Sequence, residues 1–440
     1  MFFALSLGFW SFEKTFPLYS IHYSRYTISM ARIVIAGGGF AGVEAARVIA
    51  RGLQLRGLKD KHTITIIDKN PYHTFSPALI PASTTPTSVS DDVVRSAVCI
   101  PLSDIHFGVP VEITTDEITQ FNVAWNSVVG KKKHYEYDYL VIAVGQEPTF
   151  FDIQGMKTHS FPLATIEHAL AIRREVVRQI QVHDADIAQV VVIGGGPAGV
   201  EFTGLLKNRA YAITRAVQGR CTLEVSLLDS GETILKPCTK QIQVRVARIL
   251  SGMGVKIFTN VKISFVSDQY VEFENKERVP FDMIFWSAGK AVAQTVQELP
   301  FSHERAGAVA INESGIPKIP GVMTMGRPIY VAGDVSFISN AVAWVAPNAI
   351  TGGRNAGNHI LANIDFAERL PNDFVAPRFN ANNNSIFLLG THAGVVAVPM
   401  FIPARLGVLI RRLVDLRYLL RILSLGKAWK RWKMMKVLYK

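Results

Sequence analysis

The sequence has few cysteines and no long apolar segment. Its 440 residues contain three cysteines, Cys99, Cys221 and Cys238, and none of them forms a Cys-x-x-Cys pair. Three cysteines are too few for a disulfide scaffold, and their spacing argues against a zinc ribbon or a redox-active dithiol. We expect them to be buried packing residues. Because no apolar run reaches about 18 residues, no membrane-spanning helix is expected.

Charged residues are also few, and they are unevenly placed. They make up 19% of the chain against 49% hydrophobic residues, which excludes a mostly disordered or fibrous protein. The length predicts two or three domains. Most of the net charge of +12 belongs to the last 40 residues, which hold eleven basic residues and one acidic residue. This asymmetry indicates an anionic surface as the partner of the C-terminal segment.

A glycine motif occurs twice, 157 residues apart. An apolar, β-branched run precedes Gly37, Gly39 and Gly42, and a similar run precedes Gly194, Gly196 and Gly199. In a Gly-x-Gly-x-x-Gly motif the first glycine permits the tight turn from strand to helix. The second lets a pyrophosphate approach the backbone, and the third allows close packing of helix and strand. The two copies predict an α/β fold with two Rossmann-like dinucleotide-binding domains.

Each motif is followed by a second apolar run that ends in an aspartate, Asp68 or Asp229. An acid at this position binds a ribose hydroxyl and disfavours a 2′-phosphate. NADH is therefore expected rather than NADPH at the second motif. The alternative for each aspartate is a solvated residue at a strand end.

Two further strings carry a family resemblance. Tyr139-Leu-Val-Ile-Ala-Val-Gly145 precedes the second motif, and Ile329-Tyr-Val-Ala-Gly-Asp334 follows it. With the glycine motifs, they resemble the two-dinucleotide-binding-domain flavoproteins. Within these, the stretch from Asp68 to Pro77 and the string Val200-Glu201-Phe202 look most like the type II NADH dehydrogenases, which are NADH:quinone oxidoreductases. The resemblance extends from about Ala31 to the C-terminus.

This resemblance implies FAD at the first motif and NADH at the second, without a metal site. The implied FAD residues are Gly37, Gly39, Phe40, Ala41, Gly42, Asp68, Lys69, Ala143, Gly145 and Asp334. The implied NADH residues are Gly194, Gly196, Pro197, Gly199, Asp229 and Gly289. Glu201 is implied near the nicotinamide and flavin, where desolvation would raise its pKa and suit it to a catalytic proton relay. Since Glu44 has the same place in the first motif, both glutamates could instead brace their helices.

One departure from the family concerns the electron acceptor. The family usually carries Pro-x-Ala-Gln-x-Ala-x-Gln after the flavin aspartate, lining a quinone tunnel. Here the matching positions are Pro347, Ala349, Ile350 and Arg354, so that Ile350 and Arg354 replace both glutamines. Quinone is expected on the resemblance alone, and Arg354 could instead meet a carbonyl or a charged acceptor.

Three alternatives to this function stay open. A sulfide:quinone oxidoreductase is disfavoured by the positions of the cysteines. A membrane-bound flavoprotein could bind NADH without turnover, as a sensor or docking partner. A soluble ferredoxin reductase would have no use for the basic C-terminal segment.

The C-terminal segment has two amphipathic patterns. Leu409, Leu413, Leu416, Leu420 and Leu423 recur at helical spacing, and Ala428, Trp432, Met435 and Tyr439 recur after Gly426 among lysines and arginines. Such stripes with tryptophans and basic flanks are typical of a helix lying on anionic lipid. Packing on the protein's own body and a homodimer seam are the alternatives, and nucleic-acid binding is not expected.

We therefore expect a peripheral enzyme that passes electrons from NADH through FAD to a membrane quinone without pumping protons. Its expected location is the cytoplasmic face of the cell membrane, or the mitochondrial inner membrane in a eukaryote. The expected parts are an N-terminal extension (1–30), two pieces of the FAD domain (31–161 and 291–375), the NADH domain (162–290) and a membrane-association segment (376–440).

Overall fold

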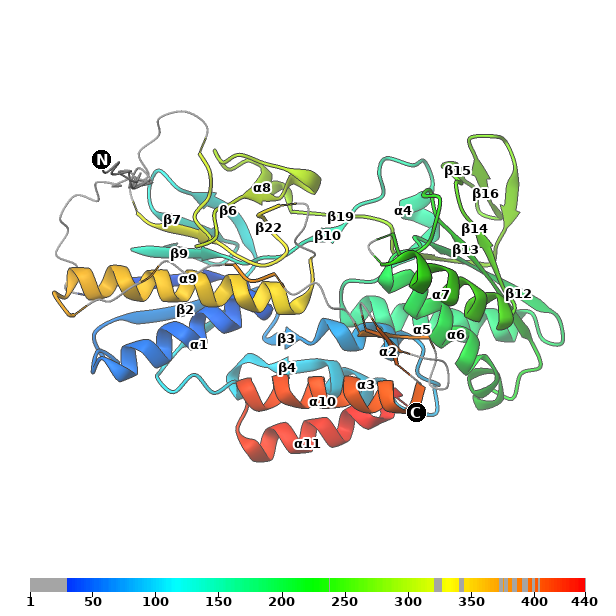
Figure 1. Cartoon of the computed structure of the whole chain (residues 1–440), viewed down its shortest axis with the longest axis horizontal. Coiled ribbons are helices and arrows are strands. Elements are labelled where there is room, and N and C mark those ends of the chain that lie inside the picture. Colours follow the sequence, from blue (N-terminus) through cyan, green and yellow to red (C-terminus); the bar gives the residue numbers. More distant parts are fainter. Residues whose placement is uncertain are drawn as a thin grey trace, which may run out of the picture.

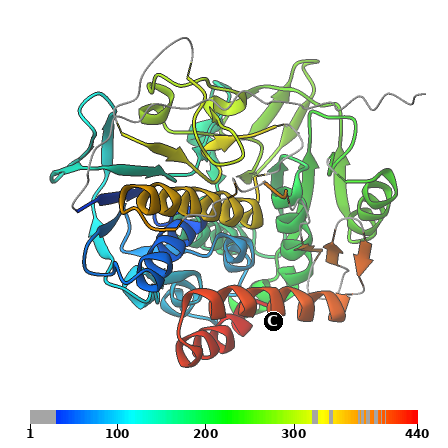
Figure 2. The same ribbon diagram turned by 60° about the vertical axis from the view of Figure 1, so that its left-hand side comes forward.

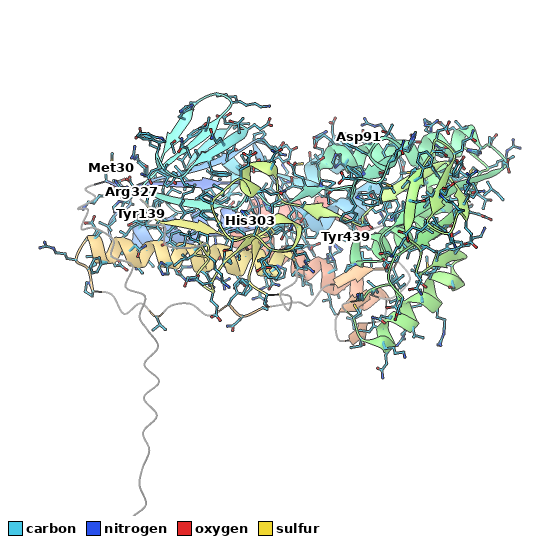
Figure 3. All side chains as sticks on the ribbon, turned by 90° about the horizontal axis from the view of Figure 1, so that it is seen from above. Met30, Asp91, Tyr139, His303, Arg327 and Tyr439 are labelled. Atoms are coloured by element: carbon cyan, nitrogen blue, oxygen red, sulfur yellow. The ribbon has the colours of Figure 1, made fainter. Side chains whose placement is uncertain are left out.

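The computed structural model describes residues 30–439, except for 237, 320–326, 340–343, 372–374, 376–378, 382–385, 390–394, 398–399 and 403. All but the last residue of the expected N-terminal extension lies outside the described residues. Figure 3 shows Met30, where the described chain begins, near Tyr139 at one end of the molecule, and Tyr439 near its middle.

Two five-stranded parallel sheets form the two halves of the protein (Figure 1), which confirms the predicted fold class. The first sheet has the order β21 (Ile329–Val331), β9 (Tyr139–Ile142), β1 (Arg32–Ala36), β2 (Thr63–Asp68) and β5 (Glu112–Thr115). The second has the order β11 (Ser160–Pro162), β18 (Met283–Trp286), β12 (Ile187–Ile193), β13 (Thr222–Leu228) and β14 (Val255–Phe258). Their central strands β1 and β12 are mostly buried, as apolar β-branched runs covered on both faces should be.

Antiparallel strands complete each half. The first half adds an antiparallel sheet of β6 (Ile118–Asn122), β7 (Ser127–Gly130) and β8 (His134–Glu136) and an antiparallel pair of β3 (Tyr72–Thr74) and β4 (Cys99–Pro101). It also contains one short parallel pair, β20 (Val309–Ala310) and β22 (Ser336–Phe337). The second adds β15 (Ile263–Val266), β16 (Tyr270–Phe273) and β17 (Arg278–Pro280). The chain passes between the halves at β10 (Glu147–Pro148) and β19 (Lys290–Ala291), which pair antiparallel. The expected domain bounds stay a prediction.

Helices follow the strands on both sheets. After β1 comes α1 (Phe40–Leu55), and after β12 comes α6 (Pro197–Ala216). The others before the C-terminal segment are α2 (Leu79–Ser83), α3 (Asp91–Val98), α4 (Met156–His159), α5 (Ile166–Val182), α7 (Lys240–Gly252), α8 (Gln294–Gln297) and α9 (Ala346–Ala367). Small residues let α9 lie directly on α1, since a Cβ at Gly353 would stand 2.1 Å from the carbonyl oxygen of Ala41. Figure 2 shows α9 running across α1, which brings its first turns to the first glycine motif.

The C-terminal segment forms a three-stranded sheet and a helical hairpin. Its elements are β23 (Ile386–Leu388), β24 (Val395–Ala397), β25 (Met400–Ile402), α10 (Ala404–Ile422) and α11 (Leu425–Met435), followed by a short turn to Tyr439. The hairpin lies beneath both halves (Figures 1 and 2). Its Arg431 donates to the carbonyl oxygen of Ser96 in α3, and its Tyr418 bonds to His73 in β3. Arg209 of α6 donates to the carbonyl oxygen of Leu438, just after α11. None of the helices in the described parts is long and apolar enough to cross a membrane.

Helix α10 buries two charged side chains and exposes several leucines. Arg411 and Asp415 are 7% and 2% exposed, and they form an ion pair with Nε and Oδ1 3.5 Å apart. Five apolar side chains on the other face are 43–51% exposed, namely Leu406, Leu409, Leu413, Val414 and Leu420. The predicted leucine stripe is therefore largely solvent-facing, although Leu423 is buried.

The prediction that the second stripe, from Ala428 to Tyr439, faces lipid is wrong. Ala428, Met435 and Tyr439 are at most 6% exposed, because they pack into the core with the buried side of α10. Trp432 is partly buried, and its indole nitrogen donates to the carbonyl oxygen of Arg412 at 2.6 Å. A helix that covers the body needs the same apolar period as one that lies on lipid, which is why the sequence pattern was ambiguous.

Candidate active site

The two glycine motifs have matching geometry at the carboxyl ends of β1 and β12. Gly37 and Gly194 have φ angles of +111° and +108°, which favour glycine at the sharp turn out of each strand. A Cβ at Gly42 or Gly199 would stand 1.9 Å from the carbonyl oxygen of the first glycine. At the second glycine of each motif no described atom lies within 4 Å of the Cβ position. The space that a phosphate requires is therefore open in both copies.

The helices after the motifs can receive a negative charge at their N-termini. Helix α1 begins at Phe40 after Gly39, and α6 begins at Pro197 after Gly196. Neither helix has a side-chain cap, and neither carries an acidic residue in its first turn. Their first N–H groups and the helix dipoles are thus available to a pyrophosphate.

The two strand-end aspartates shape the glycine loops. Asp68 Oδ2 accepts a hydrogen bond from the Gly38 amide at 2.7 Å, and Asp229 Oδ2 accepts one from the Gly195 amide at 2.6 Å. Burial raises the pKa of Asp68, against the opposing effect of its backbone hydrogen bonds. Each carboxylate retains lone pairs for a ribose hydroxyl. The structure places these aspartates at their motifs, and their ribose contacts stay a prediction.

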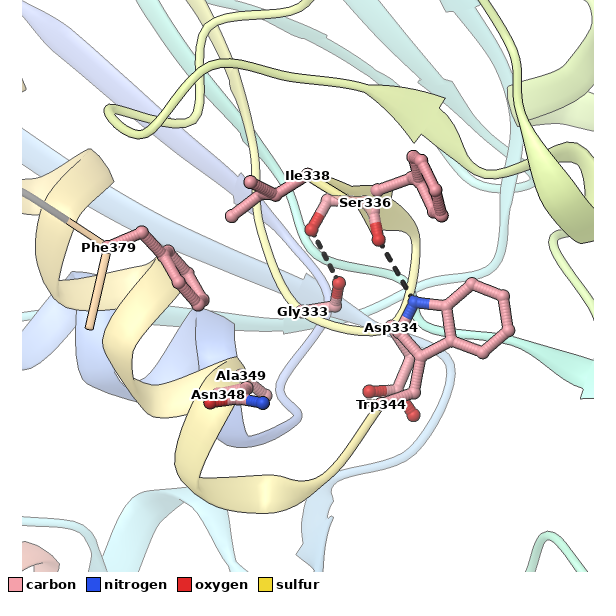
Figure 4. A pocket seen from close by; sticks show the side chains of 9 residues that line it. Gly333, Asp334, Ser336, Ile338, Trp344, Asn348, Ala349 and Phe379 are labelled. Atoms are coloured by element: carbon pink, nitrogen blue, oxygen red, sulfur yellow. Dashed lines mark hydrogen bonds between the residues drawn. The ribbon is translucent and has the colours of Figure 1, made fainter. Parts of the chain in front are cut away.

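Asp334 borders a small pocket near the first motif (Figure 4). Gly333, Trp344, Asn348 and Ala349 also line this pocket. Burial raises the pKa of Asp334, and in the described part of the chain no group donates a hydrogen bond to its carboxylate. A half-buried acceptor without a donor fits the sugar-alcohol hydroxyls of FAD. The open motif and this carboxylate together fit the cofactor that the resemblance implies.

The other predicted cofactor residues differ in how closely the chain packs around them. Gly37 packs against the carbonyl of Ala143, while Gly145 has a φ of +76° and open space at its Cβ position. Lys69 pairs with exposed Glu147 at 3.1 Å. Gly289 lies at the return crossing, where a Cβ would stand 2.7 Å from the carbonyl oxygen of Thr149.

Glu201 is 5% exposed on α6, and its Oε1 accepts a hydrogen bond from the Leu388 amide at 3.3 Å. Burial raises its pKa to about 7, although the positive charge of Arg411 opposes this shift. The carboxyl group can therefore hold or release a proton near neutral pH. Its catalytic role stays a prediction.

The predicted quinone residues have different neighbours. All four lie on α9, but Ala349 borders the Asp334 pocket, whereas Arg354 reaches back to Glu44 with Nε–Oε1 at 3.4 Å. Pro347 and Ile350 lie in the first turns of the helix, partly exposed. Quinone binding by these four residues stays a prediction.

Sequence reasoning missed several residues that the fold brings to the motifs. His73, Tyr418 and Arg421 contact the first motif or its helix, and Arg411 lies near Glu201. Tyr418, Arg421 and Arg411 could have been found from the polar face of α10 opposite the leucines. We did not interpret that face as buried.

The three cysteines are free and buried, as predicted. Burial raises the pKa of Cys99 to about 11, and it also raises the pKa values of Cys221 and Cys238. Such thiols are mostly protonated at neutral pH and are weak nucleophiles. They do not form a redox dithiol.

Comparisons with known proteins agree with this geometry. The chain is 24% identical over 398 residues to the type II NADH:quinone oxidoreductase NdhA of Mycobacterium tuberculosis, covering 83% of this chain and 78% of that one. NDH2 from Plasmodium falciparum, solved with NADH, superposes with a TM-score of 0.72 at 17% identity, covering 93% and 97% of the two chains. The sulfide:quinone oxidoreductase of Aquifex aeolicus superposes with a TM-score of 0.69 at 18% identity, covering 92% of each.

These likenesses confirm the fold and the resemblance to type II NADH dehydrogenases. Residues 31–355 match the family described as pyridine nucleotide-disulphide oxidoreductase. Because that match spans most of the chain and both glycine motifs, the protein belongs to the pyridine nucleotide-disulphide oxidoreductase family.

Proposed function

We propose that this protein is an FAD-dependent NADH:quinone oxidoreductase of the type II kind. The observation that carries the proposal is the pair of matching dinucleotide motifs in a chain without a redox dithiol. Two dinucleotides bound by one chain support hydride transfer between them. Since its buried thiols are poor partners for the electrons, the acceptor must come from outside the protein. The names of relatives such as NdhA support NADH as donor and quinone as acceptor.

The first motif and Asp334 bind FAD, and the second motif with Asp229 binds NADH. When bound, FAD supplies the redox chemistry. The chain supplies the pyrophosphate sites, the orientation of both dinucleotides and a buried carboxyl group. Glu201, with its pKa near 7, holds a proton close to the predicted nicotinamide site.

A lipid-soluble quinone requires access from a membrane, and α10 supplies the surface for it. Exposed leucines on α10 are accompanied in the same C-terminal segment by exposed cations that include Arg417, Lys430, Lys433 and Lys436. Each cation near an anionic surface contributes about 1 kcal/mol, and burying each half-exposed leucine adds roughly 1 kcal/mol. Together these contacts support peripheral attachment. We propose that the protein attaches to the cytoplasmic face of the membrane. We also propose that it can form a homodimer, which a measurement of its mass in solution would test.

Steady-state assays of the purified full chain test this function. Vesicles of phosphatidylglycerol and phosphatidylcholine would be prepared with and without a long-chain quinone, and NADH absorbance would be followed. We expect NADH oxidation that depends on quinone. Sulfide-dependent quinone reduction without NADH oxidation would instead identify the sulfide enzyme. Reduction of the bound flavin by NADH, without turnover on any quinone, would support the non-catalytic alternative.

A further inference from the structure

His73 is buried between the first glycine motif and helix α10. It is 0% exposed, and each of its ring nitrogens has one partner. Nδ1 lies 3.0 Å from the carbonyl oxygen of Gly38, and Nε2 lies 3.0 Å from the hydroxyl of Tyr418. A chain of two hydrogen bonds thus connects the C-terminal helix to the loop that faces the FAD pyrophosphate.

The partners determine which nitrogen carries the proton. A carbonyl oxygen can only accept, so Nδ1 must donate to Gly38. Nε2 is then the acceptor in a neutral ring, and the hydroxyl of Tyr418 donates to it. Burial lowers the pKa of His73 to about 4 and raises that of Tyr418 well above 10, so both groups keep these protonation states at neutral pH.

Both backbone groups of Gly38 are therefore held by side chains. Its amide donates to Asp68, and its carbonyl accepts from His73. The equivalent residue of the second motif, Gly195, also donates to an aspartate, but its carbonyl accepts from the backbone amide of Leu235 at 2.7 Å. The second motif is thus complete within its own domain, whereas the first depends on a contact that leads to α10.

Aromatic rings enclose this hydrogen-bond chain. The ring of Phe40, the first residue of α1, lies 4.7 Å from the His73 ring in an edge-on contact and 4.8 Å from the Tyr418 ring. Phe75 stacks on Tyr418 at 5.7 Å. Exclusion of water by these rings strengthens the two hydrogen bonds and makes the loss of either one costly.

Arg421, one turn after Tyr418, fixes the same face of α10 to α1. Its guanidinium donates to both carboxylate oxygens of Glu44. The register of α10 on the first motif is therefore set at two adjacent points, by a hydroxyl and by an ion pair.

We propose that Tyr418 and His73 are positioning residues for FAD, which hold the Gly38 loop in its pyrophosphate-binding shape from the C-terminal helix. The proposal rests on FAD binding at the first motif, which is part of the proposed function. It assigns α10 a role at the cofactor in addition to its outward, lipid-facing side. It also predicts that only FAD, and not the nicotinamide dinucleotide, depends on this contact.

The test is the rate of FAD release from the full-length Tyr418→Phe holoprotein, followed by the rise in flavin fluorescence after dilution. This substitution removes the hydroxyl and keeps the ring, so release should accelerate about tenfold, the effect of losing one buried hydrogen bond. Tyr439→Phe is the matched control, because Tyr439 also has a buried hydroxyl in the C-terminal segment, bonded to Asp415. It should release FAD at the wild-type rate. The affinity of Tyr418→Phe for NAD⁺, measured by calorimetry, should be unchanged.

Substitutions at His73 provide a second measurement. The amide of His73→Asn can replace Nδ1 as donor to Gly38, so its FAD release should lie between those of the wild type and His73→Ala. Release at the wild-type rate from Tyr418→Phe would overturn the proposal. Equal acceleration by Tyr439→Phe would also overturn it, since the effect would then be general loosening. A wild-type chain that holds FAD but reduces no quinone would overturn the proposed function alone, and one that holds no FAD would overturn both.

Discussion

Glu44 and Glu201 occupy the same position in the two glycine motifs, and their carboxylates have opposite electrostatic environments. Glu44 pairs with three arginines, Arg47, Arg354 and Arg421. Burial alone would raise its pKa, but the hydrogen bonds from Arg421 and Arg47 outweigh burial and lower it. Glu201 has no ion pair within hydrogen-bonding distance among the described residues, and its pKa rises to about 7. The first glutamate braces its helix, and the second can exchange a proton.

This contrast predicts stability changes of opposite sign. At pH 8 the Glu201 carboxylate is charged and buried, so Glu201→Gln should raise the free energy of unfolding by about 1–3 kcal/mol. The gain should shrink as the pH falls through 7 toward 4.5, where the carboxyl is neutral in both folded and unfolded chains. Urea unfolding at both pH values checks this. A loss of stability at pH 8 would contradict the buried-charge account.

Glu44→Gln should lower the free energy of unfolding at pH 7 by about 2–3 kcal/mol. The substitution removes the anion that pairs with three guanidinium groups. The loss of stability is smaller than for a fully buried pair, because Arg354 and Arg421 are partly exposed. Since the folded-state pKa is depressed, this contribution is present above 4.5 and lost as the pH falls through the folded pKa. The same urea series checks this, because the difference in unfolding free energy between wild type and Glu44→Gln should become smaller in acid. A difference that does not change with pH would be evidence against the ion pairs.

NADH oxidation should also depend on Glu201. If its proton is used, turnover with quinone should fall as the pH rises through about 7, and Glu201→Gln should remove that dependence. Initial rates from pH 5.5 to 8.5, at saturating NADH and quinone, would reveal it. An unchanged pH profile in the variant would assign the dependence to another group.

The second motif allows a separation of binding from folding. Nothing lies within 4 Å of the Cβ position of Gly196, so Gly196→Ala should fold normally but raise the KM for NADH about tenfold or more by blocking the pyrophosphate. Gly199→Ala should instead destabilise the domain, since its Cβ would stand 1.9 Å from a carbonyl oxygen. Gly252→Ala, open on α7, is the control for an added methyl group. Unaltered NADH kinetics in Gly196→Ala would contradict the assigned site.

The outward leucines of α10 should carry membrane attachment. Leu409→Glu with Leu413→Glu should move the protein from sedimented anionic vesicles to the supernatant, because two charges replace apolar contacts. Val244→Glu, equally exposed on α7, is the matched control and should remain bound. Turnover with a water-soluble quinone should be unaffected in both proteins. Equal sedimentation of the double variant and the control would contradict the α10 surface.

The sequence predicted those features that depend on short-range geometry. Gly37 is required by its positive φ angle at the turn, and Gly42 by its approach to the Gly37 carbonyl, so the motif alone indicates their roles. Periodicity likewise predicted the leucine stripe on α10, because a helix repeats regardless of its partner.

Contacts between distant parts of the chain were not predictable in this way. Tyr418 and His73 are 345 residues apart, and Arg421 and Glu44 are 377 apart. No local pattern indicates such pairs. The stripe containing Met435 was misassigned because apolar period does not distinguish lipid from the protein's own core.

The central claim is that electrons pass from NADH through a flavin bound by this chain to a quinone. The most direct test is anaerobic mixing of the vesicle-bound holoprotein with NADH, followed by addition of a long-chain quinone, while the visible flavin absorbance is recorded. The account predicts bleaching by one equivalent of NADH and rapid recovery with quinone. Absorbance that NADH leaves unchanged, or that stays bleached after quinone is added, would contradict it.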